Sequence, residues 1–137
     1  SAASDVYKRQ PFFQAGPALV ATCAAAAARD RFLEDGHELL AVPGSNGHVD
    51  LRKLLLELAA RGANEVLVEA GPKLAGAFAR AGLVDEFQLF VAPKFLGSSA
   101  RPLLDWPLAR MAEAQELEIR DIRAVGNDWR ITAVPKR

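Results

Sequence analysis

The fold class that the sequence predicts is an open α/β sheet, mostly parallel, with one antiparallel edge. Two observations predict it. From residue 17 onward, short apolar runs alternate with longer segments of helical periodicity, which is the pattern of strand–helix–strand units. Near the end of the chain, two strand-like runs are separated by Gly126, Asn127 and Asp128. Such a connection predicts a β-hairpin.

The strands of this sheet are predicted from apolar runs bounded by turn residues. In the third run, Val66, Leu67 and Val68 are consecutive apolar residues, which is typical of a central strand that is covered on both faces. The last two runs form the hairpin. The expected strands are residues 17–22, 38–43, 65–70, 86–93, 116–125 and 129–135.

Three helices are predicted between the strands. A weakly patterned helix is expected at residues 23–34. The second, at residues 51–62, has Asp50 as its N-cap and Gly62 at its C-cap. Its leucines fall on one face, which favours packing against the sheet.

The third helix is predicted to begin at Pro72, since proline suits the first helical position. Leu74, Ala75 and Phe78 are expected to form its buried face. Gly82 is expected at its C-cap, where glycine tolerates a left-handed backbone. This helix therefore follows directly after the third strand.

Composition restricts the classes of function. The 137 residues are half hydrophobic and a quarter charged, as in soluble globular proteins, and the length suits one domain. Lys plus Arg and Asp plus Glu each number 17, so no net charge favours nucleic acid or an acidic membrane. A single cysteine excludes an internal disulfide and a multi-cysteine metal site, and fits a cytoplasmic protein. No apolar run approaches the roughly 20 residues of a membrane span.

The join between the third strand and the third helix, VEAGPKLAGAF, is a candidate ligand site. In open α/β sheets, ligands bind where strands lead into helix N-termini. Gly71 would allow close approach of a ligand to the backbone, and the first-turn amides would favour an anion such as phosphate. Lys73 would be unfavourable against the helix dipole unless an anion lies nearby. The spacing alone leaves both interpretations open, a simple turn or a phosphate site, since it matches neither GxGxxG nor a Walker motif.

Glu69 ends the apolar third strand, where an unpaired carboxylate would be costly to bury. Two interpretations follow: it accepts hydrogen bonds from NH or OH groups of a substrate, or it pairs with an arginine or a backbone amide. The other candidates are weaker. His37 and His48 lack metal-ligand spacing, which favours surface or capping roles, and Cys23 is expected to be a small buried residue. Trp106 and Trp129 are interpreted as packing anchors.

The block VLVEAGPKLAGAFARAGLVDEFQLFVAPKFLGSSARPLL resembles the reductase domain of the bifunctional riboflavin-biosynthesis deaminase/reductase family. The resemblance extends through EIRDIRAVGNDWRITAVP and, more loosely, back to residue 17. It implies a dihydrofolate-reductase-like fold, with a mostly parallel sheet, helices on both faces and a C-terminal antiparallel hairpin. Residues 1–10 are interpreted as a disordered or non-native leader, and residues 11–137 as a partial reductase domain without its N-terminal strands.

The resemblance also implies an activity: NADPH-dependent reduction of the ribosyl group of 5-amino-6-(5-phosphoribosylamino)uracil to ribityl. Glu69 matches a substrate-contacting glutamate, whereas the family often has Thr at the position of Lys73 and Gly at that of Ala70. A cytoplasmic homodimer is implied, and no proton donor can be named. The segment that matches the cofactor-phosphate loop consists of Gly71, Pro72, Lys73, Leu74, Ala75, Gly76 and Ala77.

Zinc belongs to the deaminase half of the family, whose HxE and PCxxC pattern is absent from this sequence. No metal site is therefore expected here, and the fragment is expected to be inactive by itself. Two alternatives stay open. One is a non-catalytic nucleotide-binding or dimerisation module, and the other is a dihydrofolate-type reductase with another pyrimidine or pterin substrate.

Overall fold

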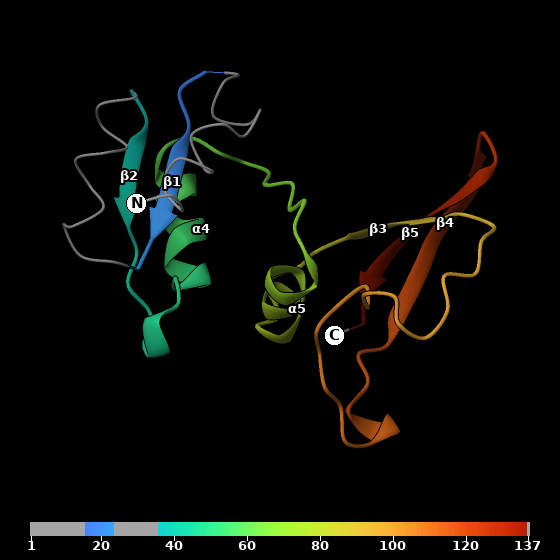
Figure 1. Ribbon diagram of the computed structural model, residues 1–137. Helices are drawn as coiled ribbons and strands as arrows, with labels where there is room; N and C mark the ends of the chain where they lie inside the picture. The colour runs from blue at the N-terminus through green and yellow to red at the C-terminus, as the bar shows by residue number, and fades with distance from the viewer. Residues whose placement is uncertain (1–15, 24–35, 137) are drawn as a thin grey trace. The chain divides into compact units, whose positions relative to one another are not determined.

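The computed structural model describes residues 16–23 and 36–136. The chain forms two compact units, residues 1–65 and 66–137, whose elements are labelled in Figure 1. The predicted leader, residues 1–10, and most of the helix predicted at residues 23–34 lie outside the described residues.

The N-terminal unit contains a short parallel strand pair (Figure 1). Strand β1, Leu19–Thr22, pairs with β2, Glu38–Ala41, which confirms the first two predicted strands. His37, just before β2, is buried, and its Nδ1 accepts a hydrogen bond from the Ala18 amide at 3.1 Å. The imidazole therefore satisfies backbone next to β1. After β2 the chain passes through a short 3₁₀ turn, η2, at Ser45–Gly47.

Helix α4, Leu51–Ala60, follows this turn and begins as predicted. The Asp50 carboxylate accepts a hydrogen bond from the Lys53 amide at 3.0 Å, which satisfies one of the free amides of the first turn. This bond is the main reason that the pKa of Asp50 lies below its ordinary value. Gly62 has φ +93°, the left-handed backbone expected just beyond a helix end. One face of α4 is half-buried, which agrees with the prediction. Its residues are Leu51, Leu54, Leu55 and Leu58.

The C-terminal unit combines one helix with an antiparallel sheet. Helix α5 spans Pro72–Arg80, and Pro72 occupies its first turn as predicted. Gly82, with φ +63°, lies just beyond its end. Phe78 is buried, but Leu74 is 46% exposed, so its expected burial is wrong. Leu74 lies one turn before Phe78, at the open end of the helix.

Three strands form the sheet of this unit, in the order β3-β5-β4. They are β3, Phe87–Val91; β4, Leu117–Val125; and β5, Asp128–Pro135. A 3₁₀ turn, η3, at Met111–Glu113 precedes β4. Strands β4 and β5 form the predicted hairpin, and Gly126 in its turn has φ +61°, a conformation that favours glycine.

The strand predicted at residues 65–70 is wrong: the segment has no regular secondary structure and is not part of a sheet. In the described part of the chain, no hydrogen bond joins its backbone to another segment, and Leu67 is 79% exposed. An apolar run specifies a strand only when neighbouring backbone lies alongside to pair with it, and the described residues provide none.

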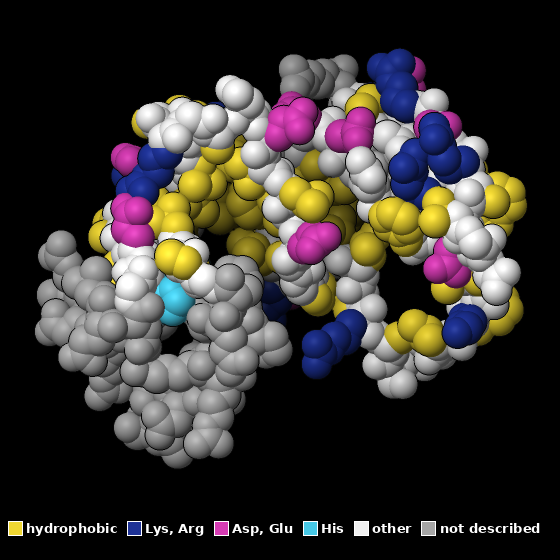
Figure 2. Space-filling model, turned by 90° about the horizontal axis from the view of Figure 1, so that it is seen from above, with side chains coloured by type: hydrophobic (Ala, Val, Ile, Leu, Met, Phe, Trp, Pro, Cys, Tyr) yellow, Lys and Arg dark blue, Asp and Glu magenta, His cyan; other side chains and the backbone are white. Residues whose placement is uncertain are grey.

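The α/β class is confirmed, whereas the mostly parallel sheet with helices on both faces is not confirmed. Among the described residues, parallel pairing is limited to β1 and β2, and β3 pairs antiparallel with β5. Phe78 and Ala133 are the buried apolar residues of the C-terminal unit. Many other hydrophobic side chains reach the surface, where they lie among charged groups of both signs (Figure 2).

Candidate functional site

The start of helix α5 leaves backbone amides free. Gly71 is the N-cap and provides no side-chain hydrogen bond. The first bond across the cap runs from the Ala75 amide to the Gly71 carbonyl, at 3.1 Å. The amides of Lys73 and Leu74 precede it and have no partner among the residues that the structure describes. These two N–H groups, together with the positive end of the helix dipole, can bind an anion.

The conformation and surroundings of Gly71 separate the two interpretations of this residue. Its φ of −68° and ψ of 168° are extended values that any residue can adopt. A methyl group in the Cβ position would meet no atom within 4 Å. Neither the turn nor the packing of the chain therefore requires glycine here. Glycine is also a favoured N-cap residue, and here it leaves the start of α5 open to an approach from outside the chain.

Lys73 lies beside these amides and is exposed. Within residues 16–23 and 36–136, no carboxylate forms an ion pair with it. A cation at a helix N-terminus without a counter-charge is mildly unfavourable, by about 0.3–1 kcal/mol. Its ammonium is thus available to an anion that binds at the helix start.

Glu69 is exposed, two residues before Gly71. Of the two interpretations of this carboxylate, an arginine or backbone partner is not found among the described residues. Glu69 was expected to need a partner because it would be buried at the end of a strand. That strand is not formed, so the carboxylate is not buried. Glu69 is free to accept hydrogen bonds from a ligand.

The remaining residues of the predicted cofactor segment differ in exposure. Pro72, Ala75 and Ala77 are half-buried, whereas Gly76 is buried. Gly76 lies against the backbone of Asp105, whose carbonyl oxygen would be 2.5 Å from a Cβ at this position. Sequence reasoning missed Asp105. The small residue in mid-helix signalled a close contact, but nothing in the sequence named its partner.

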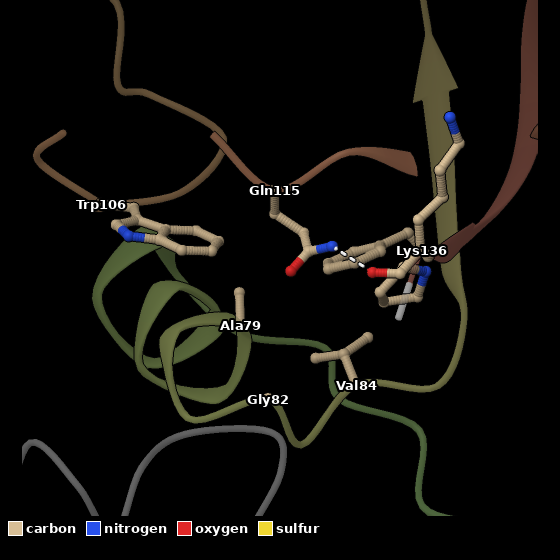
Figure 3. Close-up of a pocket in the computed structure, with 8 residues that line it drawn as sticks. Ala79, Gly82, Val84, Trp106, Gln115 and Lys136 are labelled. Atoms are coloured by element: carbon tan, nitrogen blue, oxygen red, sulfur yellow. Dashed lines mark hydrogen bonds between the residues drawn. The ribbon is translucent and has the colours of Figure 1, made fainter. Parts of the chain in front are cut away.

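A cavity of about 210 Å³ lies toward the other end of α5. Ala79 and Gly82 line it from the helix side, and Trp106 and Gln115 from the connection between β3 and β4 (Figure 3). The Gln115 side-chain amide donates to the Lys136 carbonyl at 2.9 Å, which ties this connection to the end of β5. Trp106 is half-buried here, in agreement with its interpretation as a packing anchor, whereas Trp129 is 52% exposed.

The weaker candidates show no catalytic geometry in the described residues. Cys23 is half-buried, and its thiol donates to the Gly47 carbonyl at 2.7 Å. No group of three or more His, Cys, Asp or Glu side chains in the described ranges could hold a metal ion. No helix there is long and apolar enough to cross a membrane.

The fold and this site define an α/β protein whose helix α5 begins with free amides that suit an anionic ligand. The family model of the RibD C-terminal domain matches residues 5–131. The chain therefore belongs to the RibD C-terminal domain family, which confirms the resemblance stated above.

Two curated relatives show the extent of the likeness. The riboflavin biosynthesis protein RibD of Escherichia coli K12 is 47% identical over 90 residues, which are 65% of this chain and 24% of that protein. The 5-amino-6-(5-phosphoribosylamino)uracil reductase of Buchnera aphidicola from Acyrthosiphon pisum is 30% identical over 93 residues, 67% of this chain and 45% of that protein. The chain thus spans about a quarter of the first relative and less than half of the second.

A solved structure of Acinetobacter baumannii RibD agrees with this assignment. It has a TM-score of 0.74 and 28% identity, and the match covers 86% of this chain and 31% of that one. A pyrimidine reductase-like protein of Corynebacterium diphtheriae matches with a TM-score of 0.69 at 18% identity, a likeness of fold alone. The first comparison shows an α/β fold similar to that of a RibD structure.

Proposed function

We propose that this chain is part of an NADPH-dependent reductase of riboflavin biosynthesis. The substrate is 5-amino-6-(5-phosphoribosylamino)uracil, whose ribosyl group is reduced to ribityl. Support comes from the family and from the Buchnera relative, whose name states the same reductase. NADPH, when bound, supplies the hydride for this reduction.

The observation that carries the proposal is the open start of α5, where the N-cap has no side chain and two amides are free. Gly71 is required neither by its φ nor by packing, yet it stands beside the free amides of Lys73 and Leu74. A phosphate group of the cofactor fits this place, since it accepts hydrogen bonds from both amides and is attracted by the helix dipole and the Lys73 ammonium. A side chain at Gly71 would occupy the approach. The cofactor-phosphate segment comprises Gly71, Pro72, Lys73, Leu74, Ala75, Gly76 and Ala77.

Glu69 binds the substrate in this proposal. Its carboxylate is exposed and has no partner in the described part of the chain, so it can accept hydrogen bonds from the NH and OH groups of a pyrimidine riboside. Such bonds fix the orientation of the substrate relative to the hydride donor, which is the main contribution that a protein makes in cofactor chemistry.

Homodimerisation is a second part of the proposal. Strand β4 is an edge of the β3-β5-β4 sheet, and Ile119 on it is 57% exposed. An edge strand with apolar side chains can pair with another chain, and a second copy satisfies this edge in a closed two-fold arrangement. Sedimentation of the complete gene product would report the dimer. A monomer at micromolar concentration would contradict this part alone.

The experiment is a titration of NADPH into the complete gene product that contains this chain, followed by turnover with the pyrimidine. We expect saturable binding and oxidation of NADPH that depends on the pyrimidine. Binding without turnover would favour a nucleotide-binding module, and turnover only with dihydrofolate or another pterin would favour a different reductase. Absence of binding would contradict the proposed function.

A further inference from the structure

The backbone of Asp105 is attached to helix α5 through both of its polar groups. Its amide donates to the Pro72 carbonyl at 2.9 Å, and its carbonyl accepts from Arg80 Nη1 at 2.5 Å. The two contacts reach opposite ends of the helix, which spans Pro72–Arg80. The connection between β3 and β4 is therefore fixed along the length of α5 by one residue.

The contact at Pro72 bears directly on the candidate anion site. The Pro72 carbonyl and the Lys73 amide belong to one planar peptide group. A donor that holds the oxygen therefore also fixes the direction of the Lys73 N–H. Hydrogen bonds in such a chain polarise one another, so a bond accepted by the oxygen strengthens donation by the nitrogen. Asp105 thus orients one of the two free amides at the start of α5.

Gly76 makes this contact possible. A Cβ at position 76 would lie 2.5 Å from the Asp105 carbonyl oxygen and 3.1 Å from its amide nitrogen. The neighbour is backbone, so the connection between β3 and β4 would have to move. Glycine inside a helix costs about 0.8–1.0 kcal/mol relative to alanine, and the close approach of Asp105 explains why a glycine stands here.

We propose that Gly76 and Arg80 are positioning residues for the cofactor phosphate: they hold the Asp105 backbone where it orients the Lys73 amide. This inference rests on the proposed binding of NADPH at Gly71. Within the cofactor-phosphate segment, Gly76 is buried against the Asp105 backbone, and its positioning role is exerted through that backbone. Arg80 acts through the Asp105 carbonyl and equally need not touch a ligand.

The test compares Gly76→Ala and Arg80→Met with the wild type in the complete gene product. In each variant we expect the Kd and KM of NADPH to rise about 10-fold, while the KM of the pyrimidine and kcat remain unchanged. Arg80→Lys should restore much of the affinity, since it keeps a cationic donor. Arg110→Met is the matched control and should bind NADPH as the wild type does, because this exposed arginine of the same connection contacts Glu113 and not Asp105.

The outcomes separate this inference from the proposed function. A wild type that does not bind NADPH would overturn both. A wild type that binds NADPH, with Gly76→Ala and Arg80→Met equally tight, would overturn the inference alone. Equal losses for NADPH and the pyrimidine would also overturn it, since they would indicate general destabilisation. If Gly76→Ala fails to fold, the exposed Arg80 still provides the test.

Discussion

The two α-helices of the described chain begin in different ways. Helix α4 is closed by the protein itself, because the Asp50 carboxylate accepts from the Lys53 amide at 3.0 Å. Helix α5 begins at Gly71, which has no side chain to offer, and its amides at Lys73 and Leu74 remain without a partner in the described residues. The same local requirement is met by a side chain in one helix and left unmet by the described residues in the other.

The largest expected effect concerns the open helix start. Gly71→Val should weaken NADPH binding by about 100-fold, because the added side chain occupies the approach and each lost hydrogen bond to a charged group is worth roughly 1.5–3 kcal/mol. The melting temperature should fall only modestly, since a Cβ there meets no atom within 4 Å and the remaining cost is that valine is a poorer N-cap than glycine. Calorimetric titration and thermal melting measure the two quantities. Unchanged affinity in a folded variant would refute the phosphate site.

A smaller effect is expected at Glu69. Glu69→Gln replaces charge-assisted hydrogen bonds with neutral ones, which are about half as strong. The KM of the pyrimidine should therefore rise roughly 10-fold, whereas the Kd of NADPH should remain close to that of the wild type. Steady-state kinetics with each ligand varied in turn distinguishes the two. A change in the Kd of NADPH with an unchanged KM of the pyrimidine would show that Glu69 does not bind the substrate.

Substitution of Asp50, the N-cap of α4, should lower the stability of the fold and leave NADPH binding unchanged. Asp50→Ala removes the acceptor for the Lys53 amide and should lower the melting temperature slightly. NADPH affinity should be unchanged, because the substitution leaves the amides of α5 as they are. Asp50→Asn, which keeps an acceptor oxygen, is the matched control and should retain most of the stability. Loss of NADPH binding in Asp50→Ala would contradict the division of roles between the helices.

The smallest expected effect is on pH dependence. Hydrogen bonds from Lys53 lower the pKa of Asp50, and the Arg123 and then the Arg130 guanidinium lower that of Asp121. Both carboxylates thus stabilise the folded state above their unfolded pKa, ordinarily about 3.8. That stability is lost as the pH falls through the depressed folded values. In acid denaturation, Asp50→Asn should lose less stability than the wild type as the pH falls. An unchanged dependence of stability on pH would contradict the role of Asp50 as N-cap.

Local features could be predicted from the sequence and nonlocal ones could not. The cap at Asp50, the turn at Gly126 and the start of α5 at Pro72 depend on neighbours within a few residues, and the structure confirms them. A strand at residues 65–70 would need a neighbouring strand to pair with. The apolar run alone does not show whether such a neighbour is present. The contact between Gly76 and Asp105 joins residues 29 positions apart, which no local pattern encodes.

The most direct measurement follows backbone amide resonances during a titration with NADPH. It tests whether the open start of α5, and not the closed start of α4, receives the cofactor phosphate. We predict that the amide resonances of Lys73 and Leu74 shift strongly and saturably, whereas that of Lys53, already bonded to Asp50, does not shift. Shifts of equal size at both helix starts, or none at Lys73 and Leu74, would contradict it.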